Sequence, residues 1–109
     1  MTFDFEDGNG PVPAHRHAHG NGWVADTATV AATVFVGENA RVYGNARVDG
    51  NARVFENARV FENAWVFENA WVYGDARVFV NARVYGNARV FENARVDGNA
   101  RVSELEKAI

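Results

Sequence analysis

Hydrophobic residues recur along most of this chain with a period of six. Residues 22–105 divide into fourteen consecutive hexads without an insertion. The third position is valine in every hexad, from Val24 to Val102, and the first is alanine in twelve. Successive side chains of a strand point to opposite faces, so the first and third positions share one face. The pattern therefore predicts one short strand of three or four residues per hexad, apolar on one side.

The remaining positions favour strands joined by tight corners over a helix. A helix turns by about 100° per residue, so valines six residues apart would be spread around its axis instead of forming one stripe. The fifth position is often glycine or glutamate, and the sixth is asparagine in ten hexads. Glycine and asparagine tolerate positive φ and bond to neighbouring backbone. We expect these two positions to form the corners.

Strands this short must be stabilised by stacking on their neighbours. If three hexads make one triangular turn, residues eighteen apart lie one above another in strands about 4.8 Å apart. Fourteen hexads then give about 4.7 turns. The predicted fold is all-β: a parallel β-helix, or triangular solenoid, with columns of valine and alanine inside. Asparagines of successive corners are expected to form amide ladders, as stacked identical residues do in other β-arrays.

The repeat resembles that of a known family. Hexads such as residues 40–45, Ala-Arg-Val-Tyr-Gly-Asn, resemble the bacterial hexapeptide-repeat family, and above all its uncharacterised, non-enzymatic members with such repeats. The resemblance covers about three-quarters of the chain and implies a left-handed β-helix. This chain departs from the family in one respect. Eight hexads carry an aromatic residue at the fourth position, where the family usually has a small or polar one.

The two ends lack the repeat and are expected to cap the solenoid. We predict an N-terminal cap or arm at residues 1–21, a β-helix at 22–103 and a short helical cap at 104–109. The N-terminal segment contains a possible short strand at residues 2–5 and a turn at residues 8–11. The helical cap is suggested by residues 103–106, Ser-Glu-Leu-Glu, which fit a capping box.

Composition and charge exclude several classes of partner. Eleven basic residues against fourteen acidic ones give a net charge of −3, which predicts no attraction to nucleic acid or to anionic membranes. The chain has no cysteine, so it has no disulfides and no thiolate chemistry. No apolar run approaches the roughly 18 residues that span a bilayer. The acidic N-terminus lacks the features of a secretory signal, so we expect a cytoplasmic protein.

The repeats offer no catalytic constellation. The hexapeptide-repeat family includes acyltransferases and a class of carbonic anhydrase, whose catalytic groups lie on loops that interrupt the coils or at subunit seams. Residues 22–105 have neither an interrupting loop nor a histidine, so no family catalytic residue maps onto this sequence. We predict no enzymatic activity, no catalytic residue and no cofactor-binding residue.

One cluster outside the repeats has the chemistry of a metal site. His15, His17 and His19 alternate along the arm, so an extended backbone would place three imidazoles on one face. Imidazole binds Zn²⁺ and other borderline metals. A divalent metal at these residues, with a carbonic-anhydrase-like or acyltransferase-like activity, is the alternative function. The competing interpretation is a solvated capping strand. Alternate side chains lie about 7 Å apart, so one metal cannot easily collect all three.

The outward positions predict self-association. The second position is arginine in nine hexads and tryptophan in three. Arginine and an aromatic ring of the same strand are expected to form cation–π pairs. Such residues are enriched in interface cores. We expect a structural scaffold that forms a homo-oligomer, a trimer or a dimer, or stacks end to end. A glycan-binding module is a second alternative. The predicted interface comprises Phe35, Phe55, Trp65, Phe67, Trp71, Tyr73 and Phe91.

Overall fold

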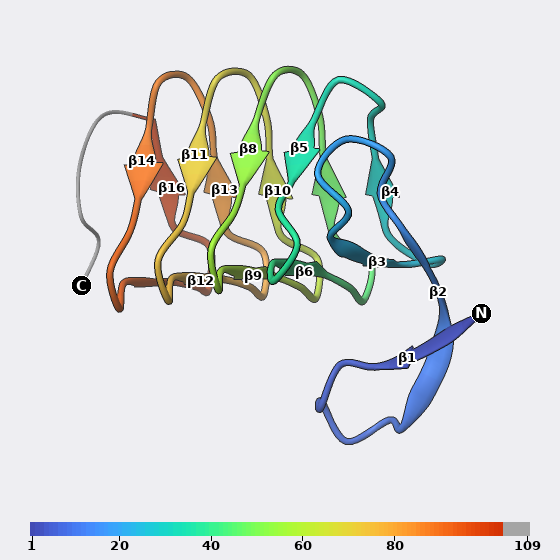
Figure 1. Ribbon diagram of the computed structural model, residues 1–109. Coiled ribbons are helices and arrows are strands. Elements are labelled where there is room, and N and C mark those ends of the chain that lie inside the picture. The colour runs from blue at the N-terminus through green and yellow to red at the C-terminus, as the bar shows by residue number, and fades with distance from the viewer. Residues whose placement is uncertain (104–109) are drawn as a thin grey trace.

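The computed structural model describes residues 1–103 as sixteen strands without a helix (Figure 1). The predicted helical cap at 104–109 lies outside the described residues. The strands are β1 (Thr2–Asp4), β2 (Pro11–Arg16), β3 (Trp23–Ala25), β4 (Thr29–Val30), β5 (Phe35–Val36), β6 (Arg41–Val42), β7 (Arg47–Val48), β8 (Arg53–Val54), β9 (Arg59–Val60), β10 (Trp65–Val66), β11 (Trp71–Val72), β12 (Arg77–Val78), β13 (Arg83–Val84), β14 (Arg89–Val90), β15 (Arg95–Val96) and β16 (Arg101–Val102).

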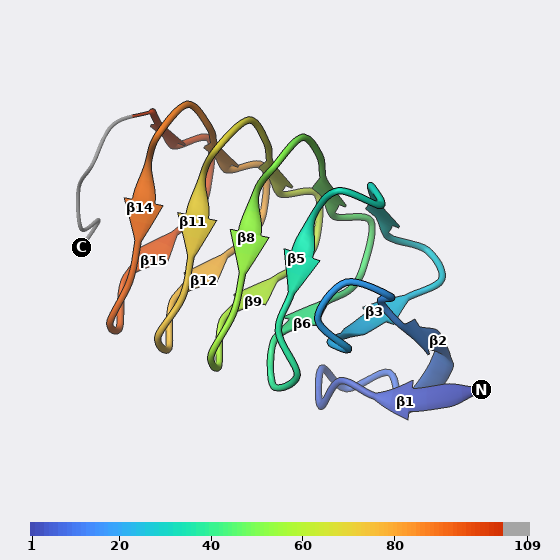
Figure 2. The same cartoon turned by 45° about the horizontal axis from the view of Figure 1, so that its top comes forward.

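From β3 onward the chain forms a parallel β-solenoid of about four turns (Figures 1 and 2). Three sheets make its walls. The first contains β3-β6-β9-β12-β15, the second β4-β7-β10-β13-β16, and the third β5-β8-β11-β14. Each strand pairs with the strand eighteen residues further on, as Val42 with Val60 and Val60 with Val78. We call these walls the first, second and third sheets.

The predicted core is confirmed. The third-position valines and first-position alanines form one buried cluster, in which almost every member from Val34 to Val90 has no exposed surface. Each buried valine contributes roughly 1.5–3 kcal/mol relative to an exposed one. Alanine beside valine lets the three walls approach one another closely. Burial decreases at the two ends, where Val30 is only partly buried and Ala100 is exposed.

The regular strands are shorter than predicted, with two residues instead of three or four. The backbone hydrogen bonds nevertheless continue past each strand end. The amides of the second, fourth and sixth positions donate to carbonyls of the next turn, as Arg41 to Ala58, Tyr43 to Val60 and Asn45 to Glu62. The corner bends the chain out of strand geometry, but it preserves the hydrogen bonding between turns.

The N-terminal segment forms an antiparallel hairpin, as the strand and turn signals at residues 2–11 suggested. Strand β1 pairs with β2, and β2 then pairs antiparallel with β3, the first strand of the solenoid. Phe5 and Ala14 are buried between the hairpin and the solenoid, against Ala25 and Tyr43. In Figure 1 this hairpin projects from one end of the solenoid, at the side where the first sheet begins.

The described residues include no helix that could cross a membrane.

Candidate functional site

The second position of each hexad points outward. The three outer faces differ because the residue at this position differs from hexad to hexad. The first sheet carries Trp23, Arg41, Arg59, Arg77 and Arg95. The second carries Thr29, Arg47, Trp65, Arg83 and Arg101. The third carries Phe35, Arg53, Trp71 and Arg89. Each face therefore has one tryptophan among arginines, and the first has the longest uninterrupted run of arginines.

Aromatic ladders run along the three corners of the solenoid. Rings at the fourth position stack on the ring eighteen residues away, with centroids 4.8–5.5 Å apart. The ladders are Tyr43–Phe61–Phe79, Phe67–Tyr85 and Phe55–Tyr73–Phe91. Phe5 of the hairpin extends the first ladder by stacking on Tyr43 at 4.7 Å. Burial raises the pKa of the Tyr43 phenol, although Arg59 nearby opposes the shift.

The expected cation–π pairs within a strand are wrong; the contacts instead join neighbouring turns. Trp71 lies between Arg53 and Arg89, at 5.8 and 4.4 Å from the ring centroid. Trp65 lies in the same way between Arg47 and Arg83, at 5.2 and 5.4 Å. The fourth-position rings stack on one another along the corners, while second-position side chains line up along the faces. An arginine consequently meets the tryptophan of the next turn.

The predicted interface residues gather around the third sheet. Phe35 and Trp71 lie on that sheet, and Phe67 precedes it at the corner it shares with the second sheet. The ladder of Phe55, Tyr73 and Phe91 follows at the corner it shares with the first sheet. Trp65 lies on the second sheet. All seven side chains are partly buried, since stacking covers much of each ring.

The structure does not bring the three histidines together. His15 Nδ1 lies 2.7 Å from the Asp26 carboxylate, and buried His17 Nε2 lies 2.7 Å from the Val34 carbonyl oxygen. His19 packs edge-on against Phe35 at 5.2 Å. Strand β2 ends at Arg16, so the alternation assumed for an extended arm stops before His17. No group of three or more metal-binding side chains occurs among residues 1–103. The metal site stays a prediction.

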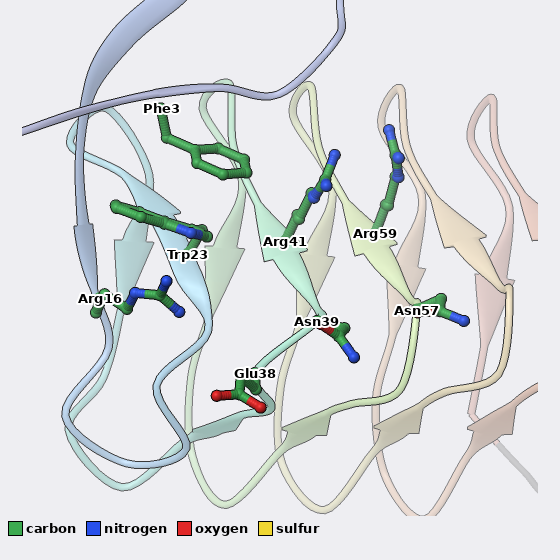
Figure 3. A pocket seen from close by; sticks show the side chains of 8 residues that line it. All are labelled: Phe3, Arg16, Trp23, Glu38, Asn39, Arg41, Asn57 and Arg59. Atoms are coloured by element: carbon green, nitrogen blue, oxygen red, sulfur yellow. The ribbon is translucent and has the colours of Figure 1, made fainter.

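A groove of about 500 Å³ lies where the hairpin meets the first sheet (Figure 3). Trp23 stands at its end with both ring faces covered, by Phe3 at 4.6 Å and by the Arg16 guanidinium at 4.5 Å. Arg41 and Arg59 line the groove side by side and extend from β6 and β9 toward the N-terminal segment (Figure 3). The lining is completed by Glu38, Asn39 and Asn57.

Glu6 of the hairpin supplies the counter-charge for this groove. Its Oε1 atom accepts a hydrogen bond from Arg41 at 3.0 Å and lies 3.6 Å from Arg59 Nη2. The hydrogen bond from Arg41 holds the pKa of the Glu6 carboxyl below its ordinary value of 4.5. Sequence reasoning missed Glu6 because the contact spans 35 residues. The alternation Phe3-Asp4-Phe5-Glu6 was the available signal that one side of this segment packs on the solenoid.

Two further grooves continue between the turns. One of about 330 Å³ follows the first sheet and is lined by Asn57, Arg59, Asp75, Arg77, Asn93 and Arg95. The other, of about 360 Å³, crosses the second sheet and is lined by Arg47, Asn63, Trp65, Asn81, Arg83, Asn99 and Arg101. Both combine guanidinium groups with asparagine amides. Of these two grooves, only the one of about 330 Å³ includes a carboxylate, that of Asp75.

Comparison with known proteins supports the repeat architecture. Residues 40–56 and 82–97 match a family described as the YdcK Beta solenoid repeat. Both segments lie within the solenoid, and each contains the repeating Ala-Arg-Val unit. No curated protein and no solved structure shows significant similarity to the chain. The chain is thus a β-solenoid repeat protein by sequence and by structure.

Proposed function

We propose that this β-solenoid is a structural scaffold without catalytic activity that associates with further copies of itself through the third sheet. The observation that carries the proposal is the composition of this face. Trp71 is held between two guanidinium groups, and an aromatic ladder borders the sheet. Tryptophan, tyrosine and arginine are the residues that most often dominate the energy of protein interfaces.

The rigidity of this face favours association. Side chains that are already stacked have fewer conformations to lose on binding, which lowers the entropic cost of forming an interface. Phe55 meets Trp71 edge-on at 5.8 Å, and Tyr73 meets it at 6.3 Å. A partner would therefore meet an ordered surface. A trimer is the arrangement that resemblance to the hexapeptide-repeat family suggests, and a dimer is the alternative.

The same resemblance extends the proposal to the type of coil. The six-residue period of buried valines and the eighteen-residue strand register support a hexapeptide-type solenoid with three hexads per turn. We propose that it is left-handed, as the coils of that family are. Vibrational circular dichroism or an experimental structure would test the handedness directly.

Replacement of Trp71 by arginine tests the interface. Arginine is the usual residue at the second position, so Trp71→Arg keeps the repeat pattern while removing the ring and adding a third adjacent positive charge. We expect the wild-type chain to have a mass that is a multiple of 12.0 kDa and the variant to shift toward 12.0 kDa. Light scattering coupled to size exclusion, at several protein concentrations, measures both.

A matched pair of variants separates the interface from general stability. Phe91 and Phe79 are each the last ring of their ladder, stacked on Tyr73 and Phe61 respectively. Phe91 borders the third sheet, whereas Phe79 lies at the corner between the first and second. Phe91→Ser should weaken the oligomer and Phe79→Ser should not. A wild-type chain that is monomeric at every concentration, or equal effects of the two substitutions, would contradict the proposal.

A further inference from the structure

Four arginines form a straight column on the first sheet. Arg41, Arg59, Arg77 and Arg95 are consecutive register partners on β6, β9, β12 and β15. Neighbouring strands of a sheet are about 4.8 Å apart, so the guanidinium-bearing residues repeat at that interval. We call these four residues the arginine column. Like charges at this spacing repel one another, and an anion between them relieves that repulsion.

The chain itself compensates the first half of the arginine column. One carboxylate, that of Glu6, contacts both Arg41 and Arg59. The hairpin holds it there because Phe5 is buried on Tyr43 immediately before it. The guanidiniums of two adjacent turns therefore bind a single carboxylate between them. This contact shows that adjacent arginines of the column can bind one carboxylate together.

The second half of the column repeats the arrangement without such a carboxylate from the hairpin. Arg77 and Arg95 are exposed, and neither forms an ion pair within 4 Å with another residue of the described part of the chain. They line the groove of about 330 Å³ together with Asn57, Asp75 and Asn93. Asp75 is the acidic residue of this groove, and its Oδ1 accepts a hydrogen bond from Asn57 at 3.3 Å.

We propose that the second half of the arginine column binds a linear acidic polysaccharide, with uronate carboxylates on Arg77 and Arg95 and sugar hydroxyls on the asparagine amides. A uronate carboxylate can lie between the guanidiniums of adjacent turns, as the Glu6 carboxylate lies between Arg41 and Arg59. Arginine pairs with carboxylates through two parallel hydrogen bonds, which gives the contact direction as well as charge. The alternating amides supply donors and acceptors for hydroxyls.

The geometry favours a polysaccharide over nucleic acid. Proteins that bind single strands stack bases on open aromatic faces. Trp23, the tryptophan of this sheet, has Phe3 on one face and Arg16 on the other, so no base can stack on it. The proposal does not depend on self-association, because the interface proposed above lies around the third sheet.

Binding of a fluorescently labelled oligogalacturonate to the full chain tests the proposal. Arg77→Gln with Arg95→Gln removes two exposed ion pairs, each contributing up to about fivefold, so the loss in affinity should be on the order of tenfold. Arg83→Gln with Arg101→Gln is the matched control. These two arginines are also exposed register partners on adjacent strands, but on the second sheet. The control pair should change the affinity less than twofold.

A gain-of-binding variant makes the test independent of folding defects. Glu6→Gln frees Arg41 and Arg59, which doubles the length of the unoccupied column, and should raise the affinity for longer oligomers. The methyl-esterified oligomer, which lacks the negative charges, should not bind. Equal losses for the two arginine pairs, equal binding of the esterified oligomer, or tighter binding of a single-stranded DNA of the same charge would overturn the proposal.

Discussion

At the scale of single residues, the fifth position of the hexad determines how each corner is built. From residue 44 to residue 98 its backbone is left-handed whether the residue is glycine, as at Gly44 with φ of 67°, or glutamate, as at Glu62 with φ of 58°. The glutamates offset this strain with a hydrogen bond. Glu62 Oε1 accepts from the Val80 amide at 3.1 Å, and Glu56 and Glu68 accept likewise from Gly74 and Gly86. A corner glutamate thus binds the corner of the next turn.

Two glycine substitutions separate backbone strain from crowding at the corner. Gly44 and Gly98 have nearly the same φ, 67° and 62°. A Cβ atom at Gly44 would lie 2.8 Å from the Glu62 backbone nitrogen, whereas one at Gly98 would meet nothing within 4 Å. Left-handed backbone costs a residue with a Cβ about 1–2 kcal/mol. We expect Gly98→Ala to lose about that much and Gly44→Ala to lose clearly more, measured by urea unfolding. Equal losses would show that crowding contributes nothing.

The residue scale is also where the sequence was least predictive. Positive φ was expected at asparagine as well as glycine, but within the described repeats it falls on the fifth position, and Asn45 and its equivalents have ordinary backbone. Amide ladders were expected at the corners. Among the described residues, Asn57 and Asp75 are stacked sixth positions whose side chains form a hydrogen bond. Composition identifies the corner residues, but it does not tell which of two adjacent residues takes the left-handed backbone.

At the scale of elements, the hairpin of β1 and β2 is an attached cap. It is held by aromatic packing, by the antiparallel pairing with β3 and by the contact of Glu6 with Arg41 and Arg59. The sequence predicted its strands but not its partners, since those contacts join residues far apart in the chain. The repeats were predictable because Val42 and Ala46 are buried like almost every other valine and alanine of the pattern.

The attachment of the hairpin should depend on pH in the acidic range. The folded-state pKa of Glu6 is below the ordinary 4.5, so its carboxylate stabilises the docked hairpin above about pH 4.5. That contribution is lost as the pH falls through the lowered pKa and the carboxylate is protonated. As the pH is lowered from 6 to 3, hydrogen exchange of residues 1–16 should become faster relative to exchange of the solenoid core.

The variant Glu6→Gln provides the control for that experiment. It should show faster exchange of the hairpin already at pH 6 and a weaker change with pH. The neighbouring His15–Asp26 contact is present in both proteins, so the difference between them isolates Glu6. An identical pH response of the two proteins would assign the effect to another group.

At the scale of the whole molecule, stability comes from contacts between neighbouring turns. Long-range contacts dominate the fold, and the strand pairings of the solenoid join residues eighteen apart. In such repeat proteins stability is approximately a sum over units and their interfaces. A whole turn of eighteen residues can therefore be removed without changing the strand register, whereas part of a turn cannot.

Internal deletions test this dependence on register. Removal of residues 58–75 joins Asn57 to Ala76 and keeps Arg77, Phe79 and their successors on the same walls. We expect this variant to fold cooperatively with reduced stability. Removal of residues 58–66 would instead point Phe67 and Asn69 inward, which buries an unpaired amide and should prevent a stable solenoid. Circular dichroism during heating distinguishes the two; similar melting of both variants would show that the register is not required.

The distribution of tryptophans gives each wall its own optical reporter. Trp23, Trp65 and Trp71 lie one on each sheet, in different polar surroundings. Trp23 is enclosed by the cap, Trp65 donates a hydrogen bond to Asp49 at 2.8 Å, and Trp71 lies between two guanidiniums. Emission from Trp23 follows release of the hairpin, and emission from Trp71 follows coverage of the third sheet. Variants that each retain one of the three tryptophans would therefore report which side of the molecule is engaged.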